Sequence, residues 1–293
     1  MALFLKQTLS RFKLHEILAT RPIVVHHLVA YLRKRKAFQE LSDLLTSTGR
    51  YEEAALVAYG QVLQCSSIDE KVRKIKTVLQ TSFHRHSDAN HLIEHVHLLE
   101  RLSPVIASDS KNSEISARQG QINIPQLDVS SSVLDALFYS NYFHFGEPEN
   151  LLSSPAAFKK IHKLTEKQAT WNAVTARASR FQWKDCEDLV LTKGWLGGRK
   201  VRGDIDLGQV VKLLHNHGAT PEVLQVFLSL VDPLEEREHL AKKFGVHTVV
   251  IDVHVLNKDR IALESYKSKL VPQSREWFYA ENALNVSNSK WKN

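Results

Sequence analysis

The chain has 293 residues, of which 43% are hydrophobic and 24% charged, and its formal net charge is +7 at pH 7. Such a composition can supply a continuous apolar core and a charged surface. With only 11 glycines and 8 prolines, the chain is poorly suited to an all-β fold, which needs many tight turns. The sequence pI of about 9.3 admits nucleic acid, an anionic membrane or an acidic protein as partner.

The start of the chain, Met1 to Leu18, is acid-poor and amphipathic, and we interpret it as the first helix rather than a targeting segment. No apolar run in the chain approaches the roughly 18 residues of a membrane-spanning helix. The two cysteines, Cys65 and Cys186, are far apart and each fits a helical pattern. They therefore predict reduced thiols in an intracellular protein rather than a disulfide framework.

Two amphipathic helical patterns meet at Gly49. The glycine can adopt the left-handed conformation that ends a helix, and the alanines after it let two helix backbones approach closely. A helix pair of this kind cannot bury its own apolar face, so it stacks on neighbouring pairs into an α-solenoid, which presents a binding surface. The apolar residues at helical spacing are Leu28, Leu32, Phe38, Leu41 and Leu45 before the glycine and Tyr51, Ala54, Ala55, Ala58 and Val62 after it.

Further helical stripes continue the pattern until the polar stretch 108–132, which contains Pro125 and predicts a long mobile loop. Asp88 is a candidate N-cap for the helix before this loop. The stripes are Ile68, Val72, Ile75 and Leu79, then Leu92, Val96 and Leu99, and after the loop the aromatic run from Phe138 to Phe143. We expect a single all-α solenoid over residues 1–270 and a polar C-terminal tail over 271–293.

The second half carries clear helix boundaries. Thr165 and Gln168 form a capping box, and Thr220 with Pro221 predicts another helix start. The run Val249 to Leu256 is rich in β-branched residues, but its flanking patterns favour a helix. The predicted apolar faces are Trp171, Val174, Ala178 and Phe181, then Leu207, Val210, Val211 and Leu214 up to Gly218, then Leu224, Phe227, Leu228 and Val231.

The segment His91 to His95 has the H-x-x-E-H order of inverted zinc peptidases. Catalysis would need both histidines on one helix face and a third protein ligand, and no later segment offers an obvious one. His84, His86 and His97 enlarge the histidine cluster, for which a metal or a pH-sensing role is the alternative to a solvated surface. We interpret the cluster as solvated and expect no metal, no cofactor and no enzymatic activity; metal analysis of the purified chain tests this.

Two other segments are candidates for a reactive thiol and for a phosphate-binding loop, and their sequences support neither. Acids surround Cys186, and a reactive thiol needs the opposite environment, so a core cysteine is expected. Gly194, Gly197 and Gly198 lack the spacing of a phosphate-binding loop and are interpreted as a break between helices.

Several segments, in this order, carry a resemblance to one family: Phe4 to Ser10, Leu98 to Arg101, Trp183 to Leu189, Lys193 to Gly197 and Lys290 to Asn293. Through them the chain resembles, essentially end to end, the C-terminal helical region of the spermatogenesis-defective protein 39 family (VIPAR). These proteins are the B-type relatives of the class C vacuolar sorting subunit sixteen. The family also carries an acidic N-terminal segment, so the chain is expected to be a fragment or a shortened form.

The resemblance implies a non-enzymatic adaptor that binds a Sec1/Munc18 protein of the vacuolar sorting type, its B paralogue, in the CHEVI complex. It implies a cytoplasmic protein, peripheral on early, late and recycling endosomes, that serves endosome-to-lysosome traffic and lysosome-related organelles. SNAREs and the endosomal membrane would be indirect partners, without nucleic acid or a small-molecule substrate.

The paralogous tethering subunit binds its partner through the helical pairs just before its Trp-acid-acid segment. Gln168 stands where the paralogue has an arginine important for binding, so the B-type pair is expected to use different polar chemistry there. Carried onto this chain, the interface comprises Leu92, His95, Leu99 and Leu102 on one helix and Lys163, Lys167, Gln168 and Trp171 on another.

The alternative from the residues alone is a basic helical-repeat protein that binds nucleic acid. It would need basic residues aligned on one face together with stacking aromatics. The basic residues are instead scattered, and the densest clusters, Arg33 to Lys36 and Lys71 to Lys76, are not interleaved with aromatics. A solvated helix face is the simpler interpretation of both clusters.

Overall fold

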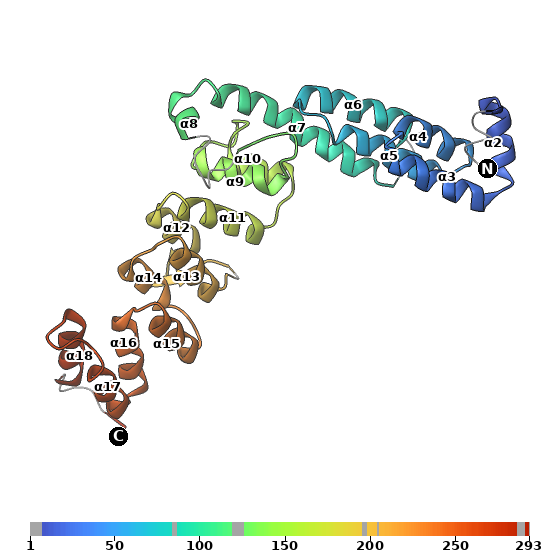
Figure 1. Ribbon diagram of the computed structural model, residues 1–293. Coiled ribbons are helices and arrows are strands. Elements are labelled where there is room, and N and C mark those ends of the chain that lie inside the picture. Colours follow the sequence, from blue (N-terminus) through green and yellow to red (C-terminus); the bar gives the residue numbers. More distant parts are fainter. Residues whose placement is uncertain are drawn as a thin grey trace. The chain divides into compact units, whose positions relative to one another are not determined.

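The computed structural model describes residues 8–83, 87–118, 126–194, 198–203, 205–285 and 291–292, and helices dominate these ranges (Figure 1). This confirms the all-α, solenoid-like fold. The elements are α2 (Arg11–Ala19), α3 (Pro22–Lys34), α4 (Phe38–Ser47), α5 (Tyr51–Val62), α6 (Ile68–Thr81), α7 (Ala89–Asp109), α8 (Ser113–Arg118), α9 (Val133–Phe143), α10 (Pro155–Ile161), α11 (Glu166–Ala178), α12 (Trp183–Val190), β1 (Leu191–Lys193), β2 (Arg199–Val201), α13 (Leu207–Asn216), α14 (Pro221–Leu228), α15 (Leu234–Lys243), α16 (His247–Asn257), α17 (Arg260–Lys267) and α18 (Arg275–Asn285).

The chain forms two compact units, residues 1–136 (unit 1) and 137–293 (unit 2). The sequence predicts one solenoid over 1–270. In both units, most packing joins helices that are neighbours in sequence, above all α4 with α5 and α6 with α7 in unit 1, and α11 with α12 and α15 with α16 in unit 2. Such pairwise stacking is the expected way for short amphipathic helices to bury their apolar faces.

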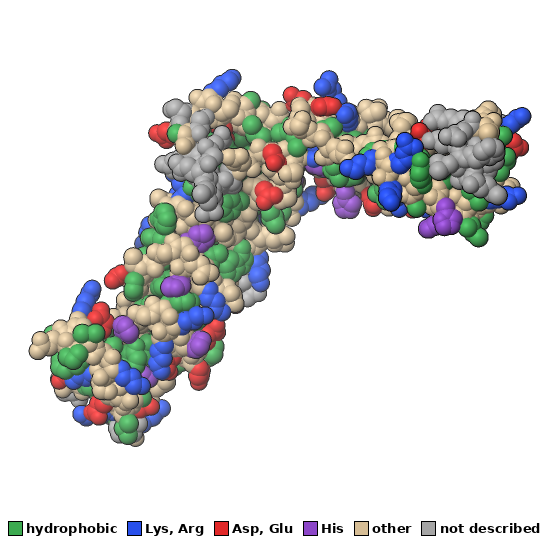
Figure 2. Space-filling view, in the orientation of Figure 1, with side chains coloured by type: hydrophobic (Ala, Val, Ile, Leu, Met, Phe, Trp, Pro, Cys, Tyr) green, Lys and Arg blue, Asp and Glu red, His purple; other side chains and the backbone are tan. Residues whose placement is uncertain are grey.

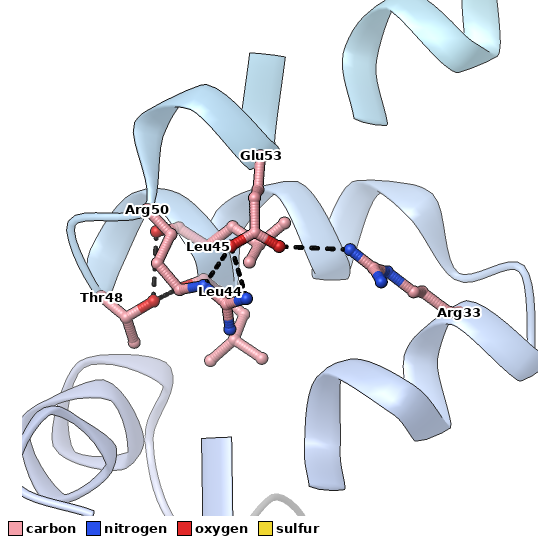
Figure 3. A network of polar contacts seen from close by, with 6 residues as sticks. All are labelled: Arg33, Leu44, Leu45, Thr48, Arg50 and Glu53. Carbon is pink, nitrogen blue, oxygen red and sulfur yellow. Dashed lines mark hydrogen bonds and ion pairs between the residues drawn. The ribbon is translucent and has the colours of Figure 1, made fainter. Parts of the chain in front are cut away.

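The junction at Gly49 is built as its sequence predicts (Figure 3). Gly49 has φ +75° and ends α4, while the Arg50 amide donates to the Leu45 carbonyl at 2.8 Å. Thr48 Oγ1 donates to the carbonyl of Leu44 at 2.9 Å. The Arg50 guanidinium pairs with Glu53 at the start of α5, where a carboxylate also suits the helix dipole. The turn therefore satisfies carbonyl groups that the end of α4 would otherwise leave unpaired.

In unit 1, one apolar cluster lies between α2, α3, α4 and α5 and another lies between α5, α6 and α7. Unit 2 contains a large cluster from α11 to α16 and a smaller one formed by α16, α17 and α18. The predicted stripes supply these cores: Leu41, Leu45, Ala55, Ile75 and Leu99 in unit 1 and Val174, Val210, Leu214, Phe227 and Val250 in unit 2 are all buried. The β-branched run after Val246 is helix α16, as its flanking patterns predict.

Helix ends follow local chemistry. The capping box of α11 is present. The backbone N–H of Gln168 donates to Thr165 Oγ1 at 3.2 Å, and the backbone N–H of Thr165 donates to Gln168 Oε1 at 3.0 Å. Asp88 and Thr220 occupy the N-cap positions of α7 and α14, and neither side chain caps the backbone. Lysine follows the C-terminus of three helices with positive φ, at Lys36, Lys163 and Lys258, a position that more often holds glycine.

Five details differ from the sequence-based expectations. Tyr51, predicted on the apolar stripe of α5, stands in the first turn of the helix and is 66% exposed. The expected tail contains helix α18, because Trp277 and Ala280 pack with α16 and α17. The expected loop 108–132 contains helix α8, and its residues 119–125 lie outside the described ranges. The glycine-rich break is a hairpin whose strands pair Leu191 with Val201. Phe181 does not continue the buried face of α11; it follows the helix with φ +58° and is 66% exposed.

Candidate partner-binding surfaces

Helix α7 carries the first group of predicted interface residues. Leu92, Leu99 and Leu102 are buried, and Leu99 has no exposed surface. They belong to the core of unit 1, so a partner can use this helix only through the exposed residues between them, such as Ile93. The prediction that a partner binds α7 stays a prediction.

His95, the fourth predicted residue of α7, is half-buried, and its Nδ1 lies 3.1 Å from the hydroxyl of Tyr59 on α5. Burial lowers the pKa of His95, and the nearby charge of Lys71 lowers the pKa further. The neutral imidazole is therefore the form that the folded chain favours. The contact gives His95 a role in holding α5 against α7, which the spacing in the sequence did not reveal.

The residues of the zinc-peptidase pattern do not form a metal-binding geometry in the described part of the chain. His91 and Glu94 are exposed on α7, while His95 is engaged with Tyr59. In the described ranges, no group of three or more His, Cys, Asp or Glu side chains is placed to hold a metal ion. His84 and His86 lie outside these ranges.

Lys71 on α6 is a buried cation that sequence reasoning missed. Only 2% of the residue is exposed, and its ammonium donates to the carbonyl of Val129. Burial lowers the pKa of Lys71, which the negative charge of Asp128 partly offsets. The contact fixes the segment after the expected loop onto α6, a structural role that explains why this lysine of the cluster Lys71 to Lys76 is not available to a ligand.

The second group of predicted interface residues lies at the start of α11 and just before it. Lys163, Lys167 and Gln168 are exposed, and Trp171 is half-buried against the core of unit 2. Gln168 uses its side-chain oxygen in the capping box. Ile161, at the end of α10, is 55% exposed beside this group in sequence. Basic, amide and apolar side chains are thus available together on one short stretch, a mixture suited to contact with another protein.

An ion pair with a buried arginine holds the other end of α11. Arg177 near the end of α11 is buried and pairs with Asp185 of α12, with Nη2 to Oδ2 at 2.6 Å. Its guanidinium also lies 4.6 Å from the centre of the Phe145 ring. Because a buried charge is tolerated only when it is paired, this contact fixes α12 on α11. Asp185, in the segment Trp183 to Leu189, therefore serves to join two helices.

Cys186 follows Asp185 and is fully buried, as the sequence predicts. Burial, aided by the charge of Asp185, raises the pKa of its thiol to about 12. Sγ lies 3.7 Å from the carbonyl oxygen of Val174, to which the thiol donates. A thiol in this state is a core residue and not a nucleophile.

The two predicted groups belong to different units: α7 lies in unit 1 and α11 in unit 2. Each is a separate candidate surface. Of the two, the surface at α11 is the one whose predicted residues are mostly exposed.

Fold and surfaces define the class to which the chain belongs: an all-α, solenoid-like protein of stacked helix pairs with one small hairpin. Within the described ranges, no helix combines the length and apolar character that crossing a membrane requires.

Comparison with known proteins gives the relatives. No protein-family model matches the chain. Over 99% of its length it is 34% identical to "Spermatogenesis-defective protein 39 homolog" of Bos taurus and of Mus musculus, covering 61% and 60% of those proteins. It is 32% identical to the protein of the same name from Danio rerio, of which it covers 60%. The resemblance to this family is thereby confirmed, and the chain spans about three fifths of the length of the curated relatives it matches.

Proposed function

We propose that the chain is a non-enzymatic adaptor that binds a Sec1/Munc18 protein of the vacuolar sorting type, the B paralogue. In this role it supports endosome-to-lysosome traffic and the formation of lysosome-related organelles, as a peripheral component of endosomes. The observation that carries the proposal is the surface at α11, where Lys167 and Gln168 are exposed on a helix anchored to the core by Trp171 and Lys163 is exposed just before it. The similarity to the spermatogenesis-defective protein 39 homologues supports the choice of partner.

Two properties of α11 favour binding: the helix is held at both ends, and the side chains of its first turn are exposed. The capping box fixes the first turn of α11, and the Arg177–Asp185 pair fixes its last turn. A side chain on a helix held at both ends loses little conformational freedom when a partner binds, so more of the contact energy appears as affinity. Exposed lysines suit an acidic patch on that partner and would speed its association.

Co-expression of the chain with the B-type Sec1/Munc18 protein, followed by size-exclusion chromatography, tests the proposal. We expect one peak that contains both proteins, and no shared peak when the other paralogue of the Sec1/Munc18 protein is used. Separate elution of two folded proteins in both experiments would refute the adaptor role for this chain.

A further inference from the structure

The positive charge of the chain has an uneven distribution. Residues 1–36 contain eight lysines or arginines and a single acid, Glu16, which gives a net charge of +7. This equals the net charge of the whole chain, so residues 37–293 carry 31 basic and 31 acidic residues. Basic residues occur throughout the sequence, but over residues 37–293 they are balanced in sum by acids, so the net positive charge of the chain equals that of the segment that forms α2, α3 and the turn after it.

Helix α3 turns one continuous face to solvent. Successive helical residues are about 100° apart, and the exposed positions of α3 all fall within about 140° of one another. The opposite face, with Val25, Leu28 and Leu32, is buried in the core of unit 1. The exposed face, which we call the α3 face, consists of Pro22, Ile23, His26, His27, Ala30, Arg33 and Lys34, and it contains no acid.

The turn after the helix extends the same basic surface. Arg35 is held by Tyr31, whose hydroxyl accepts a hydrogen bond from Nη1 at 2.8 Å. Arg33 pairs with Glu53 of α5 at 3.2 Å. Within the described ranges, no ion pair engages Lys34 or Lys36, and both are exposed. In Figure 2, lysine and arginine side chains (blue) and histidine (purple) are visible over the part of unit 1 that carries α2 to α4.

One apolar side chain stands out on this basic surface. Ile23, in the first turn of α3, is 74% exposed. The apolar stripe of α3 is used by the core, but an exposed isoleucine among basic side chains can enter the acyl boundary of a bilayer while the cations meet anionic headgroups. A nucleic-acid surface would call for stacking aromatics instead. The α3 face has no phenylalanine, tyrosine or tryptophan.

We propose that the α3 face, together with Lys36, binds the surface of an anionic lipid bilayer, with Ile23 inserted between the headgroups. The charge complementarity argues for the occupant: a membrane rich in anionic phospholipid matches a segment, residues 1–36, whose net charge is +7. This contact is separate from the surface at α11 and requires no protein partner, so it goes beyond the adaptor role proposed above.

Vesicle flotation with the 293-residue chain alone tests the proposal. The vesicles contain phosphatidylcholine, with or without about 30% phosphatidylserine as anionic lipid. We expect binding only to the anionic vesicles and release at about 0.5 M salt, where screening is strong. Failure of the folded chain to bind the anionic vesicles, or equal binding to both kinds, would overturn the proposal.

Matched variants locate the contact. Lys34→Gln with Lys36→Gln should weaken partition onto anionic vesicles by roughly 10- to 30-fold, because each basic residue near such a surface strengthens binding about fivefold. The control, Lys258→Gln with Lys269→Gln, removes the same charge from exposed positions of unit 2, and Lys258 shares the left-handed backbone of Lys36. An equal loss in the control would show that binding follows net charge alone and would refute the α3 face as the site.

The apolar contact has its own pair of variants. Ile23→Ser should lower binding by roughly fivefold or more through the loss of buried methylene groups. Ile261→Ser on α17, where the isoleucine is 64% exposed, should leave it unchanged. Circular dichroism establishes that every variant is folded. If Ile23→Ser has no effect, or if the chain prefers single-stranded RNA or an acidic peptide to the vesicles in competition, the bilayer is the wrong partner.

Discussion

Leu99 lies at the centre of α7 with no exposed surface, among Leu92, Val96 and Ile75. We expect Leu99→Asp to destabilise the chain by at least about 3 kcal/mol, because the substitution removes apolar packing and buries a carboxylate without a partner. Thermal unfolding followed by circular dichroism measures the effect.

The matched control is Ile93→Asp on the same helix, where the side chain is 39% exposed and the new carboxylate can remain hydrated. It should change the melting temperature little. A Leu99→Asp variant as stable as the control would show that Leu99 is not part of the core, and would return it to the candidate interface.

His95 gives a pH dependence whose sign follows from burial. The pKa of His95 is lowered in the folded chain, so the unfolded chain takes up a proton first as the pH falls. The stability tied to neutral His95 is fully present above the unfolded pKa of about 6.5 and is lost as the pH falls toward the folded value. Burial lowers the pKa of His254 on α16 in the same sense.

Urea unfolding at pH 7 and pH 5 therefore should show a smaller loss of stability for His95→Gln than for the unmodified chain. His91→Gln, at an exposed position of the same helix, should behave like the unmodified chain. If His95→Gln loses as much stability on acidification as the unmodified chain, another group carries the pH effect.

At the scale of the element, two glycines of the α4–α5 pair have opposite roles. Gly49 has φ +75°, whereas Gly60 lies within α5, and a Cβ at either position would meet no atom within 4 Å. Gly49→Ala should therefore destabilise by about 1 kcal/mol through backbone strain alone. Gly60→Ala should stabilise by about 0.5–1 kcal/mol because alanine has less chain entropy to lose. Urea midpoints that shift in the same direction for both variants would contradict this account of the hairpin.

The surface at α11 can be tested without disturbing its helix. Lys167→Glu with Gln168→Glu keeps a capping-box residue and adds acids to the first turn, where the helix dipole favours them. We expect unchanged or slightly higher thermal stability and at least about tenfold weaker binding to the Sec1/Munc18 protein, since reversed charge opposes an acidic partner surface.

The control for this variant makes the same change of charge elsewhere in unit 2, as Lys258→Glu with Gln273→Glu at exposed positions. A pull-down should retain the partner with the control and lose it with the α11 variant. Retention by both would place the interface on another surface.

The elements also show what a sequence can and cannot reveal. Gly49, the Thr165–Gln168 box and the buried stripes were predictable, because each depends on residues within one or two turns. The signal for α18 was present in the spacing of Trp277 and Ala280, but two isolated tryptophans in a polar segment concealed it. The Lys71–Val129 contact joins residues 58 positions apart, and no local pattern announces such a pairing. The exposure of Lys167 and Gln168 followed from their place in a first turn, whereas partner binding depends on a second molecule that the sequence does not contain.

At the scale of the whole molecule, the clusters of unit 2 lie entirely within residues 137–293. A fragment of these residues should therefore fold alone and unfold cooperatively, because it keeps every apolar contact of its two clusters. Circular dichroism and urea unfolding of the fragment check this. A fragment without helical signal, or without a sigmoidal transition, would mean that unit 2 depends on unit 1.

Pairwise stacking has a mechanical consequence. Because most contacts join helices that follow one another in sequence, a pulling force along either unit is transmitted from one helix pair to the next. Helix pairs at the end of a unit can separate before the shared apolar clusters are disrupted, so the chain should lengthen in steps and recover when the load is released. Stretching a single molecule in an optical trap would display the steps.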